Sequence, residues 1–370
     1  MDATTASLLV ATGLLAYANG ANDNFKGVAT LYGSRTFEYR GALLWATATS
    51  LAGSVAAVFL ANGLIGAFRG TGIVPESLTQ DARFLSSVGL GAGATVLLAS
   101  RIGIPISTTH ALLGGLVGAG FIATSGGIDP RVLASKFVLP LLVSPFLAIA
   151  LTAGAYPLLR AARGAMGVTR DMCLCEGARA EPVVRAADGA LALRSSGVSL
   201  TVAQSSRCEE RYLGRVLGID AQRVLDAVHV LSAGLVGFAR GMNDAPKIAA
   251  LLVGAGVAGA SPALWGVAGA IAVGGVLGSR RVAETLSHRI TSMNHGQAFT
   301  ANAATAAMVL FASRFGVPVS TTHVSVGSLT GLGLANGTAR WRTLATIGGA
   351  WVTTLPLAAL LAAAAYLVPR

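Results

Sequence analysis

The chain has 370 residues, of which 53% are hydrophobic and only 12% are charged, and its mean hydropathy is +0.66. An ordinary soluble domain carries about 25% charged residues, so this composition excludes a soluble globular protein and indicates that lipid surrounds most of the surface. The net charge of +11 does not indicate a nucleic-acid partner, because the arginines fall in short polar gaps between apolar runs.

Apolar segments long enough to cross a bilayer recur along the chain, for example at residues 42–60, 138–159 and 344–368. A helix needs about 20 residues to span a hydrocarbon core of roughly 30 Å. The first apolar run follows Met1-Asp2-Ala3, which lacks the positive segment of a signal peptide, so we expect it to remain as the first helix. The sequence predicts an all-α polytopic membrane protein with about ten to twelve transmembrane or re-entrant helices.

The first apolar run ends in Gly20-Ala-Asn-Asp-Asn-Phe-Lys26. An ionised carboxylate inside a membrane costs several kcal/mol and is a functional hypothesis by default. Asn22 and Asp23 offer oxygen ligands for a small cation, or an acceptor for a proton on a substrate; an interfacial Asp that caps a helix is the plainer alternative. Lys26 lies three residues after Asp23 and can neutralise it, contact an anion, or occupy the place of a sodium ion.

A second motif, Arg101-Ile-Gly-Ile-Pro-Ile-Ser-Thr-Thr-His110, follows a short apolar segment. Short, Pro-interrupted segments are typical of broken helices around a midplane site. The Ser-Thr-Thr run makes a helix start whose hydroxyls and unpaired N–H groups suit a tetrahedral oxyanion. Alternatively, these hydroxyls only cap the helix or bond to nearby carbonyls. The histidine either pins the turn or has a proton or gating role.

The central segment, residues 160–223, is rich in arginine and acidic residues and is predicted to be a soluble cytoplasmic loop. Alternation around Ser-Ser-Gly at 191–202 predicts a weak β-hairpin. Cys173, Cys175 and Cys208 all lie in this loop, where they form a thiolate metal site, a disulfide, or no site at all.

Both motifs recur in the second part of the chain. Arg314-Phe-Gly-Val-Pro-Val-Ser-Thr-Thr-His323 matches the second motif at seven of ten positions, with a shift of 314 − 101 = 213. Gly241-Met-Asn-Asp-Ala-Pro-Lys247 repeats the first, with a shift of 243 − 22 = 221, and again ends an apolar run. Duplication divides the chain into a membrane repeat at 1–159, the loop at 160–223 and a second repeat at 224–370. If each repeat crosses the membrane an odd number of times, the second is inverted, and both termini lie opposite the loop.

The four motif copies resemble the inorganic phosphate transporter (PiT) family, whose halves each carry a Gly-x-Asn-Asp signature and a Pro-x-Ser-Thr-Thr-His-like loop. The resemblance covers nearly the whole chain apart from the loop. It implies a homodimer with an inverted-repeat helical fold that moves inorganic phosphate with sodium or protons. The phosphate shell it implies is Ser107, Thr108, Thr109, Ser320, Thr321 and Thr322. It also implies that Asn22, Asp23, Asn243 and Asp244 hold coupling ions or shape the phosphate shell. Lys26 and Lys247 complete this charge cluster, and His110 and His323 are gating candidates, on the reading of the residues themselves.

Sodium-coupled members commonly have Asn where Lys26 and Lys247 stand, and an acidic residue near the position of Asn302. An ammonium in such a site repels a second cation, and this repulsion is weakly screened away from water. We therefore expect proton coupling, or a lysine that acts as a fixed internal cation, rather than two bound sodium ions. No cofactor and no resident metal are expected.

The nearest alternative is a sulfate permease on the same scaffold. Phosphate carries an O–H near neutral pH and needs a buried acceptor, which Asp23 or Asp244 can supply, whereas sulfate has no such proton. An enzyme is not expected, because Ser-Thr-Thr-His is too compact for a catalytic triad and the common catalytic motifs are missing from the sequence. The Arg-rich, Lys-poor composition suggests a GC-rich bacterial source and hence an inner, or cell, membrane.

Overall fold

The computed structural model describes residues 2–60, 62–167, 169–170, 184–185, 191–192, 212–213, 215–216 and 218–368. The chain divides into a larger unit, Met1–Leu159 with Asp226–Arg370, and a smaller unit, Arg160–Leu225. The three cysteines and most of the expected hairpin at 191–202 lie outside the described residues.

The elements follow one another in two series. The first series is α1 (Ala3–Asp23), the 3₁₀ turn η1 (Asn24–Gly27), α2 (Ala29–Gly33), α3 (Tyr39–Leu60), α4 (Asn62–Phe68), α5 (Glu76–Thr79), α6 (Ala82–Ile102), α7 (Thr108–Ala123), α8 (Pro130–Leu133), the π-helical turn η2 (Ala134–Val138) and α9 (Leu139–Ala165). The second series is α10 (Ala221–Gly254), α11 (Ala260–Gly278), α12 (Arg280–His288), α13 (His295–Arg314), α14 (Thr321–Asn336) and α15 (Trp341–Leu367).

Short strands lie between the two series. They are β1 (Thr169–Arg170), β2 (Val184–Arg185), β3 (Leu191–Ala192), β4 (Tyr212–Leu213), β5 (Arg215–Val216) and β6 (Ile219–Asp220). They pair antiparallel as β1 with β4, β2 with β3 and β5 with β6. The only described part of the expected hairpin is therefore β3, which pairs with the strand before it.

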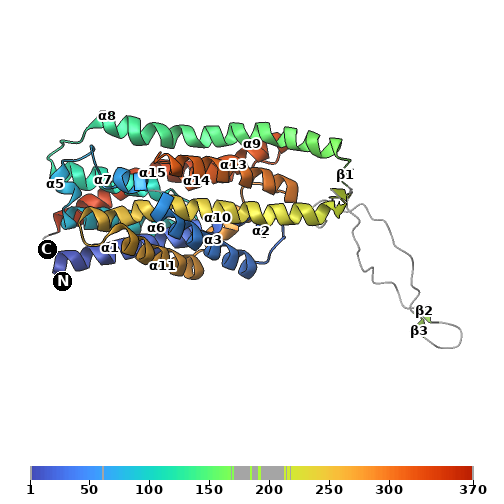
Figure 1. Cartoon of the computed structure of the whole chain (residues 1–370), viewed down its shortest axis with the longest axis horizontal. Helices are drawn as coiled ribbons and strands as arrows, with labels where there is room; N and C mark the ends of the chain where they lie inside the picture. The colour runs from blue at the N-terminus through green and yellow to red at the C-terminus, as the bar shows by residue number, and fades with distance from the viewer. Residues whose placement is uncertain are drawn as a thin grey trace. The chain divides into compact units, whose positions relative to one another are not determined.

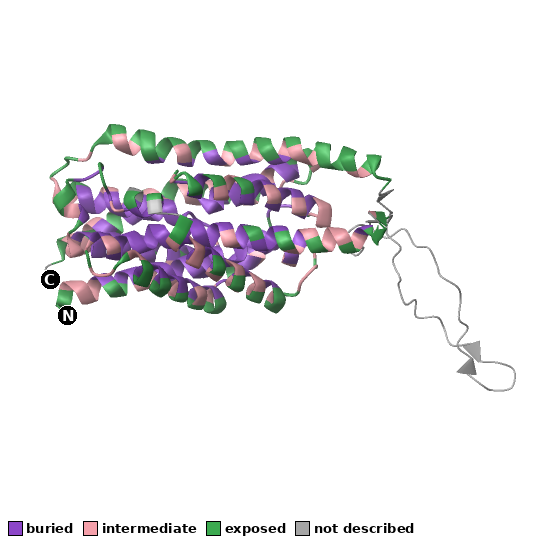
Figure 2. Ribbon diagram, in the orientation of Figure 1, coloured by how far each residue is buried: buried purple, intermediate pink, exposed green. Residues whose placement is uncertain are grey.

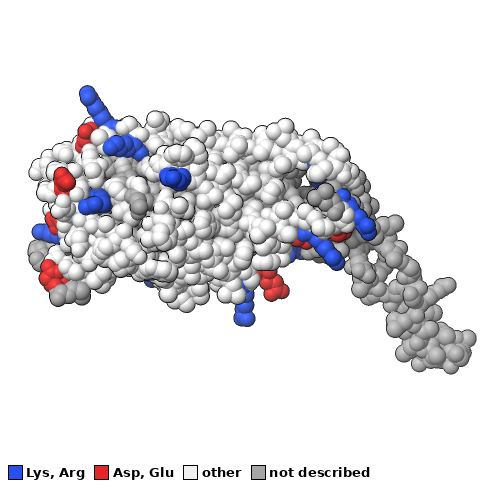
Figure 3. Space-filling view, in the orientation of Figure 1, with Lys and Arg blue, Asp and Glu red and all other residues white. Residues whose placement is uncertain are grey.

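Six of the described helical segments are long and apolar enough to cross a membrane. They are Tyr39–Leu60, Ala82–Ile102, Pro130–Ala165, Ala221–Gly254, Ala260–Gly278 and Trp341–Leu367. Buried residues face the interior of the helix bundle (Figure 2), while large apolar side chains such as Leu98, Phe146 and Trp265 are exposed on its outside. Charged side chains on the face in Figure 3 lie mostly toward the helix ends. The protein is therefore an all-α polytopic membrane protein, and this prediction is confirmed.

The two series pack against each other through close glycine contacts. A Cβ added to Gly20 on α1 would lie 2.0 Å from the carbonyl oxygen of Ile271 on α11. A Cβ added to Gly241 on α10 would lie 2.0 Å from the carbonyl oxygen of Ser50 on α3. The two contacts are equivalent under the sequence repeat, because 241 − 20 and 271 − 50 both equal 221. Only glycine permits such an approach between helices in lipid.

The two Asn-Asp motifs differ in backbone structure. α1 ends at Asp23 and the 3₁₀ turn η1 follows, whereas α10 continues past Asp244 to Gly254 with Pro246 inside it. After Asp23 the chain has Asn and Gly, both weak helix formers, while Ala and Ile dominate after Asp244. The first motif therefore lies at a helix end and the second within a continuous helix.

Candidate anion site

Five Asp, Glu, Lys or Arg side chains are buried in the described part of the chain: Asp23, Lys26, Arg240, Asp244 and Lys247. Lys26 forms an ion pair with Asp23, and Lys247 Nζ lies 3.8 Å from Asp244 Oδ1. With all five ionised, three cations and two carboxylates leave an excess of 3 − 2 = 1 positive charge. A buried charge without a partner is strongly unfavourable, so the cluster has the charge to accept a monovalent anion.

Lys26 connects the loop of its own half with the helix start of the other. Its Nζ donates to the carbonyl oxygen of Ile106 at 3.1 Å and contacts Thr322 Oγ1. Thr322 Oγ1 also donates to the Ile106 carbonyl oxygen, at 2.6 Å. The lysine predicted from the first Asn-Asp motif thus reaches both Ser-Thr-Thr loops.

Lys247 makes the equivalent contacts from the other side. Its Nζ donates to the carbonyl oxygen of Val319 at 2.7 Å and to Thr109 Oγ1 at 2.9 Å, and Thr109 Oγ1 donates to the Val319 carbonyl oxygen at 3.2 Å. Val319 corresponds to Ile106 and Thr322 to Thr109, because 319 − 106 and 322 − 109 both equal 213. The repeat in sequence is therefore also a repeat in contacts, with each lysine bridging the two halves.

The two serines cap their helices. Ser107 Oγ accepts from the His110 backbone N–H at 3.1 Å, and Ser320 Oγ accepts from the His323 N–H at 3.2 Å. These two serine oxygens therefore act as helix caps, which is the alternative that the motif left open. The N–H groups of the two threonines that open each helix, Thr108 and Thr109 on α7 and Thr321 and Thr322 on α14, precede the first intrahelical hydrogen bond and remain suited to an anion. Thr321 is buried at the first position of α14.

The two asparagines brace the loops. Asn22 Nδ2 donates to Ser100 Oγ at 3.2 Å, and Asn22 Oδ1 accepts from the Ile106 N–H at 3.0 Å. Asn243 Oδ1 accepts from Ser313 Oγ at 3.2 Å, which is the equivalent contact, since 313 − 100 = 213. Each Asn therefore joins its Asn-Asp motif to the second motif of the same half.

Sequence reasoning did not single out Arg240. It is buried on α10, where Nη1 donates to Asn19 Oδ1 and Nη2 donates to Asn24 Oδ1, both at 3.3 Å, and it also contacts Ser50 Oγ. Two signals point to it in the sequence. It is an arginine inside an apolar run, and it stands where the first half has Asn19, since 240 − 19 = 221.

Asn19 itself joins the two carboxylates. Its Nδ2 lies 3.2 Å from Asp23 Oδ2 and 3.4 Å from Asp244 Oδ2, and it donates to Thr108 Oγ1 at 3.0 Å. Thr108 Oγ1 in turn lies 3.5 Å from Asp23 Oδ2. The structure thus brings both Asn-Asp motifs and both Ser-Thr-Thr motifs into one buried cluster.

The two candidate gating histidines also meet. The rings of His110 and His323 lie 4.5 Å apart in an edge-to-face arrangement, and His323 lies 3.9 Å from the ring of Trp351. His323 Nδ1 donates to the carbonyl oxygen of Leu141 at 3.2 Å. This bond holds His323 in place in the first turn of α14.

A pocket of about 490 Å³ lies beside the loop that precedes α14. Its lining includes Thr71, Lys136, Gly316 and Pro318. The third lysine of the chain, Lys136, therefore lines the same pocket as Pro318, which stands two residues before Ser320.

Membrane-crossing helices around a buried, repeated cluster of charges define a membrane transporter. The model of the phosphate transporter family matches residues 19–362, and the chain belongs to that family. Members of this family are transporters rather than enzymes, and the substrate that they transport is phosphate.

Individual proteins match over nearly the whole chain. A probable low-affinity inorganic phosphate transporter of Rhizobium meliloti (strain 1021) is 30% identical over 385 residues, covering 99% of this chain and 98% of the relative. A protein of Mycobacterium leprae (strain TN) with the same description is 28% identical over 363 residues, covering 95% and 74%. The solved structure of the sodium-dependent phosphate transporter aligns with a TM-score of 0.75 at 21% identity, covering 99% of this chain and 98% of that one. This last match shows a shared fold.

Proposed function

We propose that this protein moves inorganic phosphate across the membrane together with protons, by alternating access to the buried cluster between its two halves. The observation that carries the proposal is the excess positive charge of the five buried side chains, placed between two Ser-Thr-Thr helix starts. Dihydrogen phosphate carries the single negative charge that this excess requires. The relatives described as inorganic phosphate transporters support the choice of anion.

Phosphate oxygens would replace the contacts that the lysines make with Thr109 and Thr322. The first-turn N–H groups of α7 and α14 would donate to the same oxygens. Asp23 and Asp244 supply acceptors for the protons that phosphate carries. A sulfate ion would meet these carboxylates without a proton to donate, so the site discriminates against it.

The lysines favour protons over sodium as the coupling ion. Each carboxylate already has an ammonium beside it, Lys26 beside Asp23 and Lys247 beside Asp244. A sodium ion at either carboxylate would face that ammonium at short range. The structural neighbour is described as sodium-dependent, so coupling by a different ion on the same fold is the specific content of this proposal.

The contacts between the two halves can change together, as alternating access requires. Lys26 reaches Thr322 and Lys247 reaches Thr109, so a rocking motion of one half against the other changes both contacts together. Within the larger unit, α1 and α10 run in opposite directions (Figure 1), which supports an inverted second half. The homodimer and the bacterial inner membrane belong to the same proposal.

Uptake of radiolabelled phosphate into proteoliposomes tests this function. A proton gradient and a sodium gradient are imposed separately, with sulfate and arsenate as competitors. We expect uptake with the proton gradient, little stimulation by sodium, and competition by arsenate but not by sulfate. Sulfate flux without phosphate flux would establish the sulfate permease instead. Uptake that requires a sodium gradient would contradict the proposed proton coupling.

A further inference from the structure

A line of polar side chains runs through the larger unit from the start of α10 toward the anion site. Its members, which we call the polar column, are Asp226, His229, His295, Thr36, Ser232, Asn302, Thr30, Thr305, Ser325 and Ser328. All except Asp226, His295 and Thr36 are buried. The roles assigned to the anion site use none of these residues.

The outer end of the polar column contains two imidazoles and a carboxylate. His295 Nδ1 lies 2.6 Å from Asp226 Oδ1, and the Asp226 side chain is 40% exposed. Thr36 Oγ1 lies 3.5 Å from His295 Nε2 and 3.4 Å from His229 Nδ1. His229 Nε2 is buried without a hydrogen-bond partner among the described residues. The partly exposed Asp226 carboxylate is thus linked, through His295 and Thr36, to the buried imidazole of His229.

The groups around the two imidazoles come from several elements. α10 contributes Asp226 and α13 contributes His295, while the segment after α2 contributes the neutral Thr36 and the Ser34 carbonyl oxygen, 3.3 Å from His295 Nε2. On the α9 side, the Tyr156 hydroxyl accepts from Gln297 at 3.2 Å, two residues along α13 from His295.

The inner part of the column continues toward the lysines. Asn302 Nδ2 donates to Ser232 Oγ at 3.3 Å and to Thr30 Oγ1 at 2.9 Å. Ser232 is three residues after His229 on α10, and Thr30 is four residues after Lys26. His229 and Ser232 are about one turn apart on α10, a step that one water molecule can bridge, while Lys26 and Thr30 lie on the consecutive turns η1 and α2.

A parallel line leads to the other helix start. Thr305 Oγ1 donates to Ser328 Oγ at 3.0 Å. Ser325, one turn before Ser328 on α14, lies three residues after Thr322. The inner ends of both lines therefore approach the pair Lys26 and Thr322, which are in contact.

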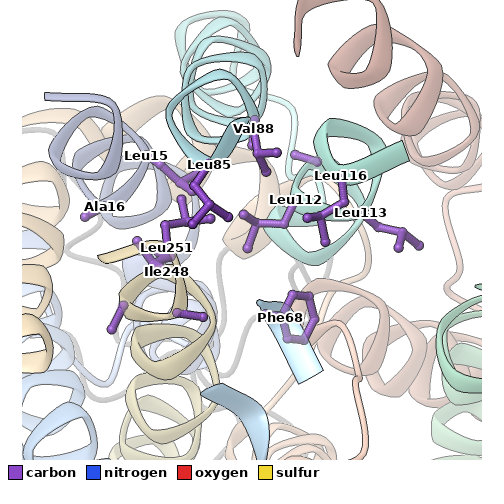
Figure 4. Packing of buried hydrophobic residues seen from close by; sticks show 14 of the residues in the cluster. Leu15, Ala16, Phe68, Leu85, Val88, Leu112, Leu113, Leu116, Ile248 and Leu251 are labelled. Carbon is purple, nitrogen blue, oxygen red and sulfur yellow. The ribbon is translucent and has the colours of Figure 1, made fainter. Parts of the chain in front are cut away.

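At the equivalent positions, the opposite half of the chain has apolar residues or glycine. The shift of 221 relates His229 to Leu8, Ser232 to Ala11 and Thr30 to Leu251. The shift of 213 relates Asn302, Thr305, Ser325 and Ser328 to Gly89, Ala92, Leu112 and Gly115. Leu112 and Leu251 belong to the tightly packed apolar cluster in Figure 4. Packing at these positions does not require polar side chains, and burying them is unfavourable without a function.

We propose that His229, His295 and Asp226 form a proton-binding site, and that the polar column carries protons between it and the anion site. This inference rests on the proposed proton coupling. A sodium ion prefers oxygen ligands, and the two imidazoles are nitrogen donors. Phosphate does not fit between side chains that already bond one another. Among the described residues, no cluster of His, Cys, Asp and Glu has the arrangement of a metal site.

The proton transfers balance along the column. A proton taken up from water makes His295 an imidazolium, which Asp226 stabilises. His295 Nε2 passes its proton to Thr36 Oγ1 while the Thr36 hydroxyl proton moves to His229 Nδ1. His229 then releases its Nε2 proton to a water in the column. One proton enters and one leaves, and the reverse sequence releases a proton to the end where α10 enters the bundle.

Purified protein in proteoliposomes separates this route from phosphate binding. Phosphate–phosphate exchange without a gradient needs no net proton movement, whereas uptake driven by a pH gradient does. We expect His229→Gln, His295→Gln and Thr36→Val to exchange phosphate like the wild type. Their gradient-driven uptake, and the proton flux reported by a trapped pH-sensitive dye, should fall about tenfold or more, since a positioned proton-transfer group contributes about 10²-fold or more.

Two matched variants serve as controls. Thr36→Ser keeps the hydroxyl and should restore driven uptake. His288→Gln removes a histidine that packs on Tyr32, outside the column, and should behave as the wild type. Driven uptake at the wild-type level in both His229→Gln and His295→Gln would overturn the proton route. An equal loss of exchange and of driven uptake in both variants would also overturn the proton route. Wild-type uptake driven only by a sodium gradient would overturn it as well. Absence of exchange in the wild type itself would instead refute the proposed function.

Discussion

The two Asn-Asp motifs are nearly identical in sequence and differ in their electrostatic surroundings. In the first half, Lys26 pairs closely with Asp23 in a 3₁₀ turn, so this pair is neutral in itself. In the second half, Lys247 is 3.8 Å from Asp244 on a continuous helix, and Arg240 adds a further cation one turn away. The excess charge of the site therefore belongs to the second half.

This difference shows what duplication leaves free to change. The lysine contacts with the opposite helix start are the same in both halves: Lys26 contacts Thr322, and Lys247 contacts Thr109. Position 19 and its equivalent, position 240, have diverged into an amide and a guanidinium that bond each other. One half supplies a balanced ion pair, and the other supplies the charge that attracts an anion.

The largest effect is expected from removing either carboxylate. Asp23→Asn and Asp244→Asn should each abolish phosphate transport, because the substrate loses its proton acceptor and a buried lysine loses its counter-charge. Uptake in proteoliposomes measures the loss, and size-exclusion chromatography in detergent checks that the variants still insert and purify. Normal uptake by both variants would show that these carboxylates have no role in the mechanism and that the repeat of the Asp is structural.

A smaller effect, confined to the second half, is expected at Arg240. Arg240→Gln should weaken phosphate binding by about 10- to 100-fold, because the cluster loses its excess positive charge and a charge interaction away from water is worth a few kcal/mol. Isothermal titration calorimetry with phosphate measures this change. Arg240→Lys keeps the charge and should recover part of the affinity. Equal binding by Arg240→Gln and the wild type would show that the excess charge does not select the anion.

Features that are local in the sequence were predictable. The apolar segments, the four motif copies and the Asp-x-x-Lys spacing all lie within short stretches, and they predicted the fold class and the residues that meet at the site. The convergence of Lys26 on Thr322 was foreseeable only in outline, because the two are 296 residues apart. The repeat predicted two facing copies without predicting which atoms touch.

Features that depend on tertiary contacts were not predictable. The position of Arg240 inside an apolar run is visible in the sequence, but its contact with Asn19 appears only once α10 packs against α1. His229 and His295 are 295 − 229 = 66 residues apart in sequence, yet their rings lie 5.8 Å apart and Thr36 Oγ1 lies within 3.5 Å of both. The continuity of α10 across Asp244 depends on helix formers that outweigh Pro246, a balance that the motif does not reveal.

The smallest effect on transport, and the sharpest test of the equivalence of the two halves, is expected at the glycine contacts. Gly20→Ala and Gly241→Ala should lower the free energy of unfolding by similar amounts, about 1–3 kcal/mol each. Each new Cβ would lie 2.0 Å from a backbone oxygen of the other half. Gly13→Ala, on the same helix as Gly20, has open space for the Cβ and should be neutral or slightly stabilising. Thermal unfolding followed by size-exclusion chromatography measures the three variants. Similar stability of Gly20→Ala and Gly13→Ala would show that α1 and α11 do not pack at this distance, and unequal losses at Gly20 and Gly241 would show that the interlock between halves is itself asymmetric.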